Sequence, residues 1–300
     1  FKLNVSGTTN LQMALAWNRA HEENIDAMPH IFKVFVNVGL PPMSSGAYGL
    51  PQQFEFSTVN APVGNIPQTY DVAYDLDPAK INIIEIVKIT EANWNAQFTE
   101  HSGPQPNYLT AQNFTLSGDD NIVLNKYVKS ATESSRKIEF IGDSITCGFC
   151  NMCKLLPNST GYHIENYEES WAYKTCVSKN DPRGVGFGAD CHTESWSGYG
   201  MYRNVNGNMT VTMPNIFNQT CGTCFAGQVP SDVPTQWFPS SPPSSSSSAP
   251  EWIPDVIVIN LGTNDWARPH NSTFVDDFTT RYTAFVRFLV QVYEKTPHLF

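Results

Sequence analysis

The sequence is poor in charged residues, and positive charge is the scarcer sign. Of its 300 residues, 15% are charged, with 18 Lys and Arg against 28 Asp and Glu and a net charge of −10. Average soluble proteins carry about 25% charged residues. So few cations cannot build the basic face that nucleic-acid binding requires, which excludes that class. The 12% aromatic content excludes a disordered chain.

Long apolar runs are also missing. No stretch approaches the roughly 18 apolar residues of a membrane helix. The chain begins at Phe1 without a Met or a signal peptide, and it stops at Phe300 inside an apolar run. We therefore expect a chain that is cut at both ends.

Cysteine is absent from residues 1–146, so that part of the chain is expected to fold without disulfides. Two CxxC-type groups could be drawn as a zinc site, but no His lies at ligand spacing, and disulfides with one remaining thiol are favoured. The spacing leaves the connectivity open. The seven residues are Cys147, Cys150, Cys153, Cys176, Cys191, Cys221 and Cys224.

Asn-X-Ser/Thr sequons are present in mild excess over chance. Together with the low charge and the cysteines they favour an extracellular, secreted glycoprotein. The six sequons begin at Asn4, Asn113, Asn158, Asn208, Asn218 and Asn271.

Residues 1–132 have the pattern of an all-β domain. Short β-branched and aromatic runs alternate with turn sequences such as PPMSSG, NAPVGN and DLDPAK. Strands at this spacing predict a β-sandwich, with the polar stretch Asn125–Lys137 at its boundary. The runs are Ile31–Val38, Phe54–Val59, Thr69–Leu76 and Ile81–Ile89.

Residues 133–300 predict an α/β domain with a parallel sheet. Lys137–Ile141 is a short apolar strand, and Asp255–Leu261 is a continuous apolar run typical of a strand buried on both faces. The Ser/Pro-rich stretch Pro239–Pro250 is expected to be a flexible surface insertion.

A helix is predicted after the second of these strands. Asn271-Ser272-Thr273 has capping chemistry, and apolar residues then recur at helical spacing from Phe274 to Tyr293. Pro297 ends the helix, and His298-Leu299-Phe300 is expected to begin the next strand. Strand, helix and strand form the βαβ unit of an α/β domain.

Three short motifs carry candidate chemistry. Gly142-Asp143-Ser144 follows a strand, at the sheet edge where α/β proteins bind ligands. Glu194-Ser195-Trp196-Ser197-Gly198-Tyr199-Gly200 can present a backbone N–H to an oxyanion, although alone it is more often a glycine turn. Gly262-Thr263-Asn264-Asp265 places a side-chain amide at a strand end, where it can donate to an oxyanion or serve as a cap.

Taken together and in this order, the motifs resemble those of the SGNH (GDSL-type) hydrolase superfamily. GDSITCG, WSGYGMYRN and VINLGTND each match a block, and the resemblance spans roughly residues 136–300. The preceding all-β region and the phrases IVKITEANW and RKIEFIGDSITCG are similar to carbohydrate esterase family 2, acetyl esterases with an N-terminal jelly roll. The resemblance therefore implies a jelly roll followed by an SGNH hydrolase domain.

The resemblance also implies roles. Ser144 is the nucleophile, and its own N–H, the N–H of Gly198 and the amide of Asn264 form the oxyanion hole, with Gly200 as the alternative to Gly198. We interpret Asp143 as an acceptor that fixes the loop. Trp196 and Trp266 are candidates for stacking on a sugar ring, or for simple packing. No metal or cofactor is required.

The family's histidine block, D-x-x-H, has no match in this chain. None of the seven histidines matches that position, including His163, His192, His270 and His298. Either the α/β domain is truncated before this block, which the end of the chain favours, or the protein is catalytically dead. We expect these 300 residues alone to have little esterase activity.

Three functions follow from these observations. The first is an extracellular acetyl esterase that acts on decorated polysaccharide such as acetylated xylan. The second is a lipid or small acyl-ester hydrolase of the same superfamily, and the third is a glycan-binding protein without catalysis. No nucleic acid is expected as a partner.

Overall fold

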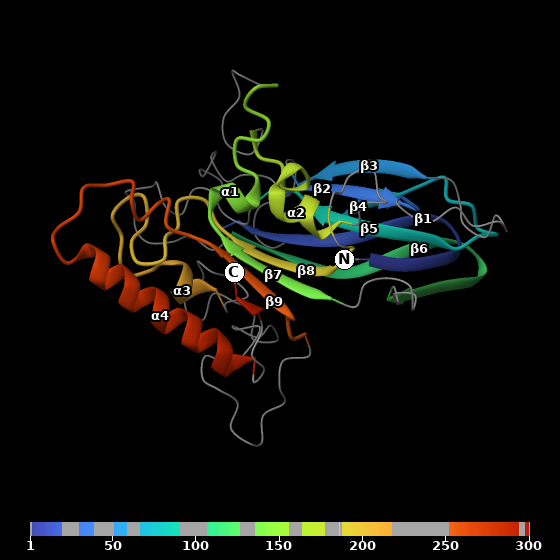
Figure 1. The fold of residues 1–300 in the computed structure, drawn as a ribbon. Coiled ribbons are helices and arrows are strands. Elements are labelled where there is room, and N and C mark those ends of the chain that lie inside the picture. The colour runs from blue at the N-terminus through green and yellow to red at the C-terminus, as the bar shows by residue number, and fades with distance from the viewer. Residues whose placement is uncertain are drawn as a thin grey trace.

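The computed structural model describes residues 2–19, 30–38, 51–58, 67–90, 107–126, 136–155, 164–177, 186, 188–217, 252–293 and 298–299. An antiparallel β region precedes a parallel sheet flanked by helices (Figure 1). The predicted all-β and α/β regions are therefore confirmed at this level. Among the described helices, none is both long and apolar enough to cross a bilayer.

The antiparallel region is one curled six-stranded sheet. A long central strand, β1, pairs with β6 over nearly its whole length, and pairs first with β5 and then with β4 on its other edge. The sheet order is β3 (Gln52–Ser57), β2 (Ile31–Val36), β5 (Asn82–Lys88), β1 (Lys2–Arg19) and β4 (Pro67–Ala73), with β6 (Asn107–Lys126) beside β1.

Because β1 changes partner along its length, the sheet curls, and β3 and β4, which stand at opposite ends of the strand order, come into contact. The rings of Phe54 and Tyr74 lie 4.5 Å apart, and those of Phe56 and Tyr70 lie 5.5 Å apart. The curled sheet encloses a core of aliphatic residues from β1, β2, β4 and β5. The four predicted strands are confirmed, whereas β1 and β6 were not predicted.

The second region contains a four-stranded parallel sheet in the order β10-β9-β7-β8. Its strands are β7 (Lys137–Gly142), β8 (Asp190–Ser195), β9 (Val256–Asn260) and β10 (His298–Leu299). The predicted strands at β7, β9 and β10 are confirmed. Both faces of β9 are packed, because Ile257 and Ile259 join one apolar cluster while Val256 and Val258 join another.

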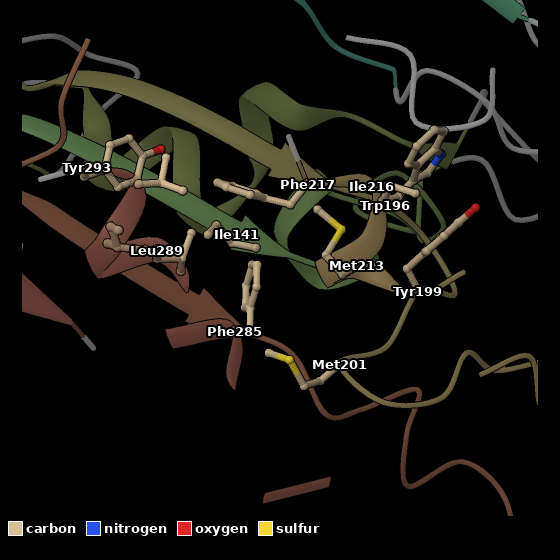
Figure 2. Packing of buried hydrophobic residues seen from close by; sticks show 12 residues of the cluster. Ile141, Trp196, Tyr199, Met201, Met213, Ile216, Phe217, Phe285, Leu289 and Tyr293 are labelled. Carbon is tan, nitrogen blue, oxygen red and sulfur yellow. The ribbon is translucent and has the colours of Figure 1, made fainter. Parts of the chain in front are cut away.

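Helix α4 (Phe274–Val292) covers one face of this sheet. Phe285 and Leu289 are buried against Ile141 of β7, as Figure 2 shows, and the predicted apolar stripe is confirmed. The helix begins where expected, but Thr273 makes no side-chain cap. Its hydroxyl donates to the carboxylate of Asp277 at 2.9 Å, and its oxygen accepts no N–H from the first turn of the helix.

Shorter helices complete the α/β region. They are α1 (Ser144–Cys147), the 3₁₀ helix η3 (Tyr167–Glu169), α2 (Trp171–Cys176) and α3 (Met213–Ile216). α2 covers the face of the sheet opposite α4, because Ala172 packs with Ile138 and Phe140 of β7. The sheet is therefore sandwiched between helices.

The two regions are joined through η3. The Tyr167 N–H donates to the carbonyl of Ile89, just past β5, at 3.0 Å. Lys33 of β2 forms an ion pair with Glu168, and these side chains are only 17% and 10% exposed. Tyr173 packs with Phe35 in the same place. This junction is apolar, hydrogen-bonded and charge-paired.

Candidate active site

The candidate site lies where three parallel strands end together. The β-ladder pairs Gly142 at the end of β7 with Ser195 on β8 and with Asn260 on β9. The Trp196 N–H continues this ladder by donating to the Gly142 carbonyl at 3.1 Å. The three predicted motifs follow directly after these strand ends, so the fold brings them to one edge of the sheet.

Ser144 is the first residue of α1 and is partly exposed. As the first helical residue it has an N–H that the helix itself cannot satisfy. Among the described residues, no acceptor binds this N–H and no group is hydrogen-bonded to the hydroxyl. Both groups are therefore available to a bound molecule.

Asp143 is fully buried beneath the serine. Its carboxylate accepts the Ile145 N–H at 3.0 Å, which caps α1 and fixes the direction in which Ser144 leaves the strand. Burial raises the pKa of Asp143, and hydrogen bonds from the Ile145 N–H and the Thr263 side chain partly offset the increase. This geometry is that of a loop-fixing acceptor.

Asn264 lies in the loop after β9 and is buried. Its amide nitrogen donates to the Tyr199 carbonyl at 2.8 Å, and lies 3.5 Å from the Asp143 carboxylate. The first contact is a good hydrogen bond, while the second is at the limit of one. One amide proton is thus firmly held, and the other is only weakly engaged.

The glycine motif provides a second free donor. Gly198 is buried with φ of +77°, a conformation that favours glycine, and its N–H meets no acceptor among the described residues. The Gly200 N–H, in contrast, donates to the Asn204 side chain at 3.0 Å. The geometry favours Gly198 over Gly200 as the donor to a ligand.

Asp265, which received no role in the sequence analysis, is a fully buried carboxylate next to Asn264. It accepts the N–H groups of Met201, Tyr202 and Arg203 at 2.9, 2.7 and 2.8 Å. The sequence signal was present only in the Asn-Asp pair itself. The partners of Asp265 lie more than sixty residues earlier in the chain.

The two candidate tryptophans differ in exposure. Trp196 is only 8% exposed, and its ring stacks on Tyr199 within the apolar cluster, so it is placed for packing. Trp266 is 48% exposed and lies against the rings of His270 and Phe274. Only the second, two residues after Asn264, is substantially exposed.

The structure describes the side chains of three histidines, and each has its own surroundings. His30 is buried at the start of β2, and His270 lies beside Trp266 and Arg203. His192 lies between two carboxylates on β7 and β8. None of these is hydrogen-bonded to Ser144. The side chains of His163 and His298 lie outside the described residues.

A polar cluster in the α/β region is centred on the buried side chain of Glu139, in the middle of β7, and extends to the partly exposed His192 and Glu194. Glu139 of β7 is fully buried, accepts the Tyr293 hydroxyl at 2.7 Å and lies 3.3 Å from His192 Nδ1. His192 Nε2 lies 3.2 Å from Glu194. Burial raises the pKa of Glu139. Burial lowers the pKa of His192, but the hydrogen bonds to both carboxylates more than compensate and raise it to about 10.

Two disulfides are present, Cys150–Cys153 and Cys176–Cys191. The thiol of Cys147 is buried and lies 3.5 Å from the Ser197 hydroxyl, whereas Cys221 and Cys224 lie outside the described residues. The described part of the chain holds no group of three or more His, Cys, Asp or Glu side chains suited to a metal ion. The first CxxC-type group therefore holds a disulfide.

Sequence comparison finds relatives that cover part of the chain. No family model matches. The cellulase/esterase CelE of Acetivibrio thermocellus is 31% identical over 170 residues, which is 55% of this chain and 17% of CelE. An acetylxylan esterase / glucomannan deacetylase of Cellvibrio japonicus is 25% identical over 210 residues, 69% of this chain and 45% of that protein. The chain spans less than half of either relative.

Structure comparison covers the chain almost completely. A family two carbohydrate esterase from Clostridium thermocellum, in complex with cellohexaose, has a TM-score of 0.63 at 21% identity over 99% of this chain and 68% of that one. An acetyl xylan esterase from Butyrivibrio proteoclasticus has a TM-score of 0.62 at 16% identity, over 99% and 70%. The chain therefore has the fold of these esterases. The expected resemblance to carbohydrate esterase family 2 is confirmed at the level of the fold.

Proposed function

We propose that this protein is a serine esterase that removes acetyl groups from polysaccharide through an acyl-enzyme. The proposal rests on one observation: three hydrogen-bond donors and one serine hydroxyl lie in motifs at the same edge of the sheet. The Ser144 hydroxyl and N–H, the Gly198 N–H and one Asn264 amide proton are all without a firm partner among the described residues. An ester carbonyl requires this combination of nucleophile and oxyanion donors.

In this mechanism Ser144 Oγ attacks the acetyl carbonyl carbon, and the carbonyl oxygen becomes an oxyanion. The Ser144 N–H, the Gly198 N–H and the Asn264 amide donate to it, and each such donor is worth on the order of 10²–10³ in rate. Collapse of this intermediate expels the sugar hydroxyl. Water then attacks the acyl-enzyme at the same carbon, which releases acetate and restores the serine.

Proton transfer requires a general base that takes the Ser144 proton and returns it to the leaving alcohol. No group among the described residues is hydrogen-bonded to that hydroxyl. Asp143 does not fill this role, because it lies buried beneath α1 with its carboxylate on the Ile145 N–H. The general base is the component that the described residues leave unassigned.

A polysaccharide substrate is supported by the exposed ring of Trp266 and by the names of the relatives. An aromatic face beside an ester-cleaving site suits the apolar face of a sugar. One related protein is an acetylxylan esterase, and one structural neighbour binds cellohexaose. We propose an acetylated β-linked glycan such as xylan. The low charge fraction of the chain agrees with a neutral substrate.

We also propose the finer features of the domain assignment. Residues 1–132 form a jelly-roll-like domain, supported by the change of β1 between two partner strands. Residues 133–300 belong to the SGNH hydrolase domain. An extracellular location is supported by two disulfides and by exposed sequon residues at Asn208 and Asn271.

The test measures acetate release from acetylated xylan by the full-length protein. Ser144→Ala should abolish release, and Asn264→Ala should lower kcat by about 10²–10³-fold. Ser272→Ala, at an exposed position before α4, is the matched control and should leave the rate unchanged. Equal rates for Ser144→Ala and the unchanged protein would refute the proposal.

Two further measurements separate the other candidate functions. Hydrolysis rates of p-nitrophenyl esters from acetate to octanoate distinguish an acetyl esterase from a hydrolase of longer acyl chains. Binding of xylan or cellohexaose without any Ser144-dependent acetate release would identify a glycan-binding protein that has lost catalysis.

A further inference from the structure

Asp265 joins two loops of the candidate site. Its Oδ1 accepts two consecutive backbone N–H groups, from Tyr202 and Arg203, and its Oδ2 accepts the Met201 N–H. All three distances are between 2.7 and 2.9 Å, as expected for a charged acceptor. A fully buried carboxylate is costly unless it is bonded in this way. The loop after Gly200 is thus folded around this single side chain.

The contact is reciprocal. Arg203 Nη2 donates to the backbone carbonyl of Asp265 at 2.7 Å. Gly200 passes so close that an added Cβ would lie 2.7 Å from Asp265 Oδ2 and 2.1 Å from the Arg203 carbonyl oxygen. The backbones of the two loops therefore have little freedom to move apart.

These bonds continue to the oxyanion donors. Asn264 directly precedes Asp265, and its amide donates to the carbonyl of Tyr199, the residue after Gly198. The separation of the Gly198 N–H from the Asn264 amide is consequently set by one side-chain contact and by the Asp265 bonds. A displacement of about 1 Å in such donors can cost 10²-fold in rate.

We propose that Asp265 is a positioning residue that sets the geometry between the Gly198 and Asn264 donors. It acts through these donors and does not touch the substrate. The inference rests on the proposed function, because the donors matter only if an oxyanion forms at this edge of the sheet.

The carboxylate is chemically required for this role. In Asp265→Asn, the amide carbonyl oxygen can still accept the Tyr202 and Arg203 N–H groups. The new NH₂ then faces the Met201 N–H, so two donors oppose each other and one buried N–H is left without an acceptor. The substitution changes almost no volume, so its effect reports on hydrogen bonding and charge.

Kinetics of the full-length protein form the first test. Asp265→Asn should lower kcat for an acetyl ester by about 10²-fold with KM changed by less than about threefold, because oxyanion donors act mainly in the transition state. Asp277→Asn is the matched control. Its carboxylate meets the same loop only through the Tyr202 hydroxyl, at 3.4 Å, and its kcat should change by less than about threefold.

A double-mutant cycle distinguishes positioning from a general structural effect. In an Asn264→Ala background, Asp265→Asn should cost far less than it does alone, because one of the donors that it positions is already gone. Fully multiplicative losses would show that Asp265 acts independently of Asn264 and would overturn the proposal.

Amide hydrogen exchange provides a test that needs no activity. Asp265→Asn should speed exchange above all at Met201, whose N–H loses its acceptor, while exchange in α4 stays unchanged. If the Met201 amide exchanges as slowly as before, the contact does not hold the loop and the proposal fails.

The outcomes separate this inference from the proposed function. Full activity of Asp265→Asn beside an inactive Ser144→Ala refutes the positioning role alone. Unchanged hydrolysis by Ser144→Ala refutes the proposed function itself, together with the role that Asp265 would have in it.

Discussion

Removal of the Tyr293 hydroxyl should destabilise the α/β region by a predictable amount. This hydroxyl donates to Glu139 Oε2 at 2.7 Å, and both residues are fully buried. In Tyr293→Phe the ring remains and only the donor is lost. A hydrogen bond to a charged group contributes about 1.5–3 kcal/mol, and a buried carboxylate that loses a donor retains its desolvation cost. We expect a loss of about 2 kcal/mol in the free energy of unfolding.

Urea denaturation followed by tryptophan fluorescence measures this loss. With a slope of about 3 kcal/mol per M, 2 kcal/mol moves the midpoint of the α/β transition by roughly 0.7 M. Tyr282→Phe is the matched control. Tyr282 lies on the same helix and packs at the edge of the same cluster, and its hydroxyl has no hydrogen-bond partner among the described residues.

The comparison of the two variants decides the outcome. Tyr282→Phe should stay within about 0.5 kcal/mol of the unchanged protein. If Tyr293→Phe shifts the midpoint no more than Tyr282→Phe does, then Glu139 is satisfied without the tyrosine. The buried cluster would then not stabilise the end of α4.

Three further predictions concern stability. Hydrogen bonds to carboxylates raise the folded-state pKa of His192 from 6.5 to about 10. The contribution of His192 to the free energy of unfolding is therefore complete below pH 6.5 and is lost as the pH rises toward 10. His192→Gln should flatten this decline in urea midpoints, and an unchanged slope would contradict it. Lys33→Met leaves the Glu168 carboxylate largely buried, and should cost about 1–3 kcal/mol by urea denaturation. Lys80→Met breaks the exposed pair with Asp77 and should cost less than about 0.5 kcal/mol. Equal losses of stability in the Lys33 and Lys80 variants would show that the Lys33 pair is well solvated. Leu289→Ala, in the core beneath α4, should cost about 2–5 kcal/mol by thermal or urea unfolding, and a loss below 1 kcal/mol would mean that the core collapses around the vacancy.

The parts of the fold that follow a local period were predictable from the sequence. The apolar stripe from Phe274 to Tyr293 has the spacing of a helix face, and the structure buries it against the sheet. The apolar runs at β7 and β9 have the length and flanks of buried strands, and both form. In each case the residues of one segment suffice to predict its secondary structure, because the spacing of their apolar side chains shows which of them will be buried.

The long strands β1 and β6 were missed because their signals are interrupted. In β1 the buried residues Val5, Leu11, Met13 and Leu15 alternate, but irregular pairing between Ser6 and Asn10 breaks the period. β6 is rich in Asn, Asp and Gly, which disfavour strands. Each strand pairs with the other over nearly its full length, and a partner that lies 88 to 123 residues away cannot be predicted from the local pattern.

The candidate site shows the same division. Ser144 and Asn264 follow apolar strands, whereas Gly198 follows β8, whose polar sequence DCHTES was not predicted as a strand, and the fold brings all three motifs to one edge of the sheet. Asp265 gave no signal beyond its place in the Asn-Asp pair, because the three N–H groups that it binds approach it only in the folded chain. Trp196 and Trp266 were equivalent in sequence, and only burial separates them.

The junction at η3 has a consequence for protein engineering. A line of backbone hydrogen bonds leads from the Ile89 carbonyl to Tyr167, and from its neighbour Asn166 to Gly148 at 3.2 Å, the residue that ends α1 one turn after Ser144. A variant from which the antiparallel region is trimmed would thus lose the contacts that support α1, the helix that begins at Ser144. The antiparallel sheet is therefore expected to stabilise the proposed active site, and chimaeras that exchange it should keep the contacts at Lys33 and Ile89.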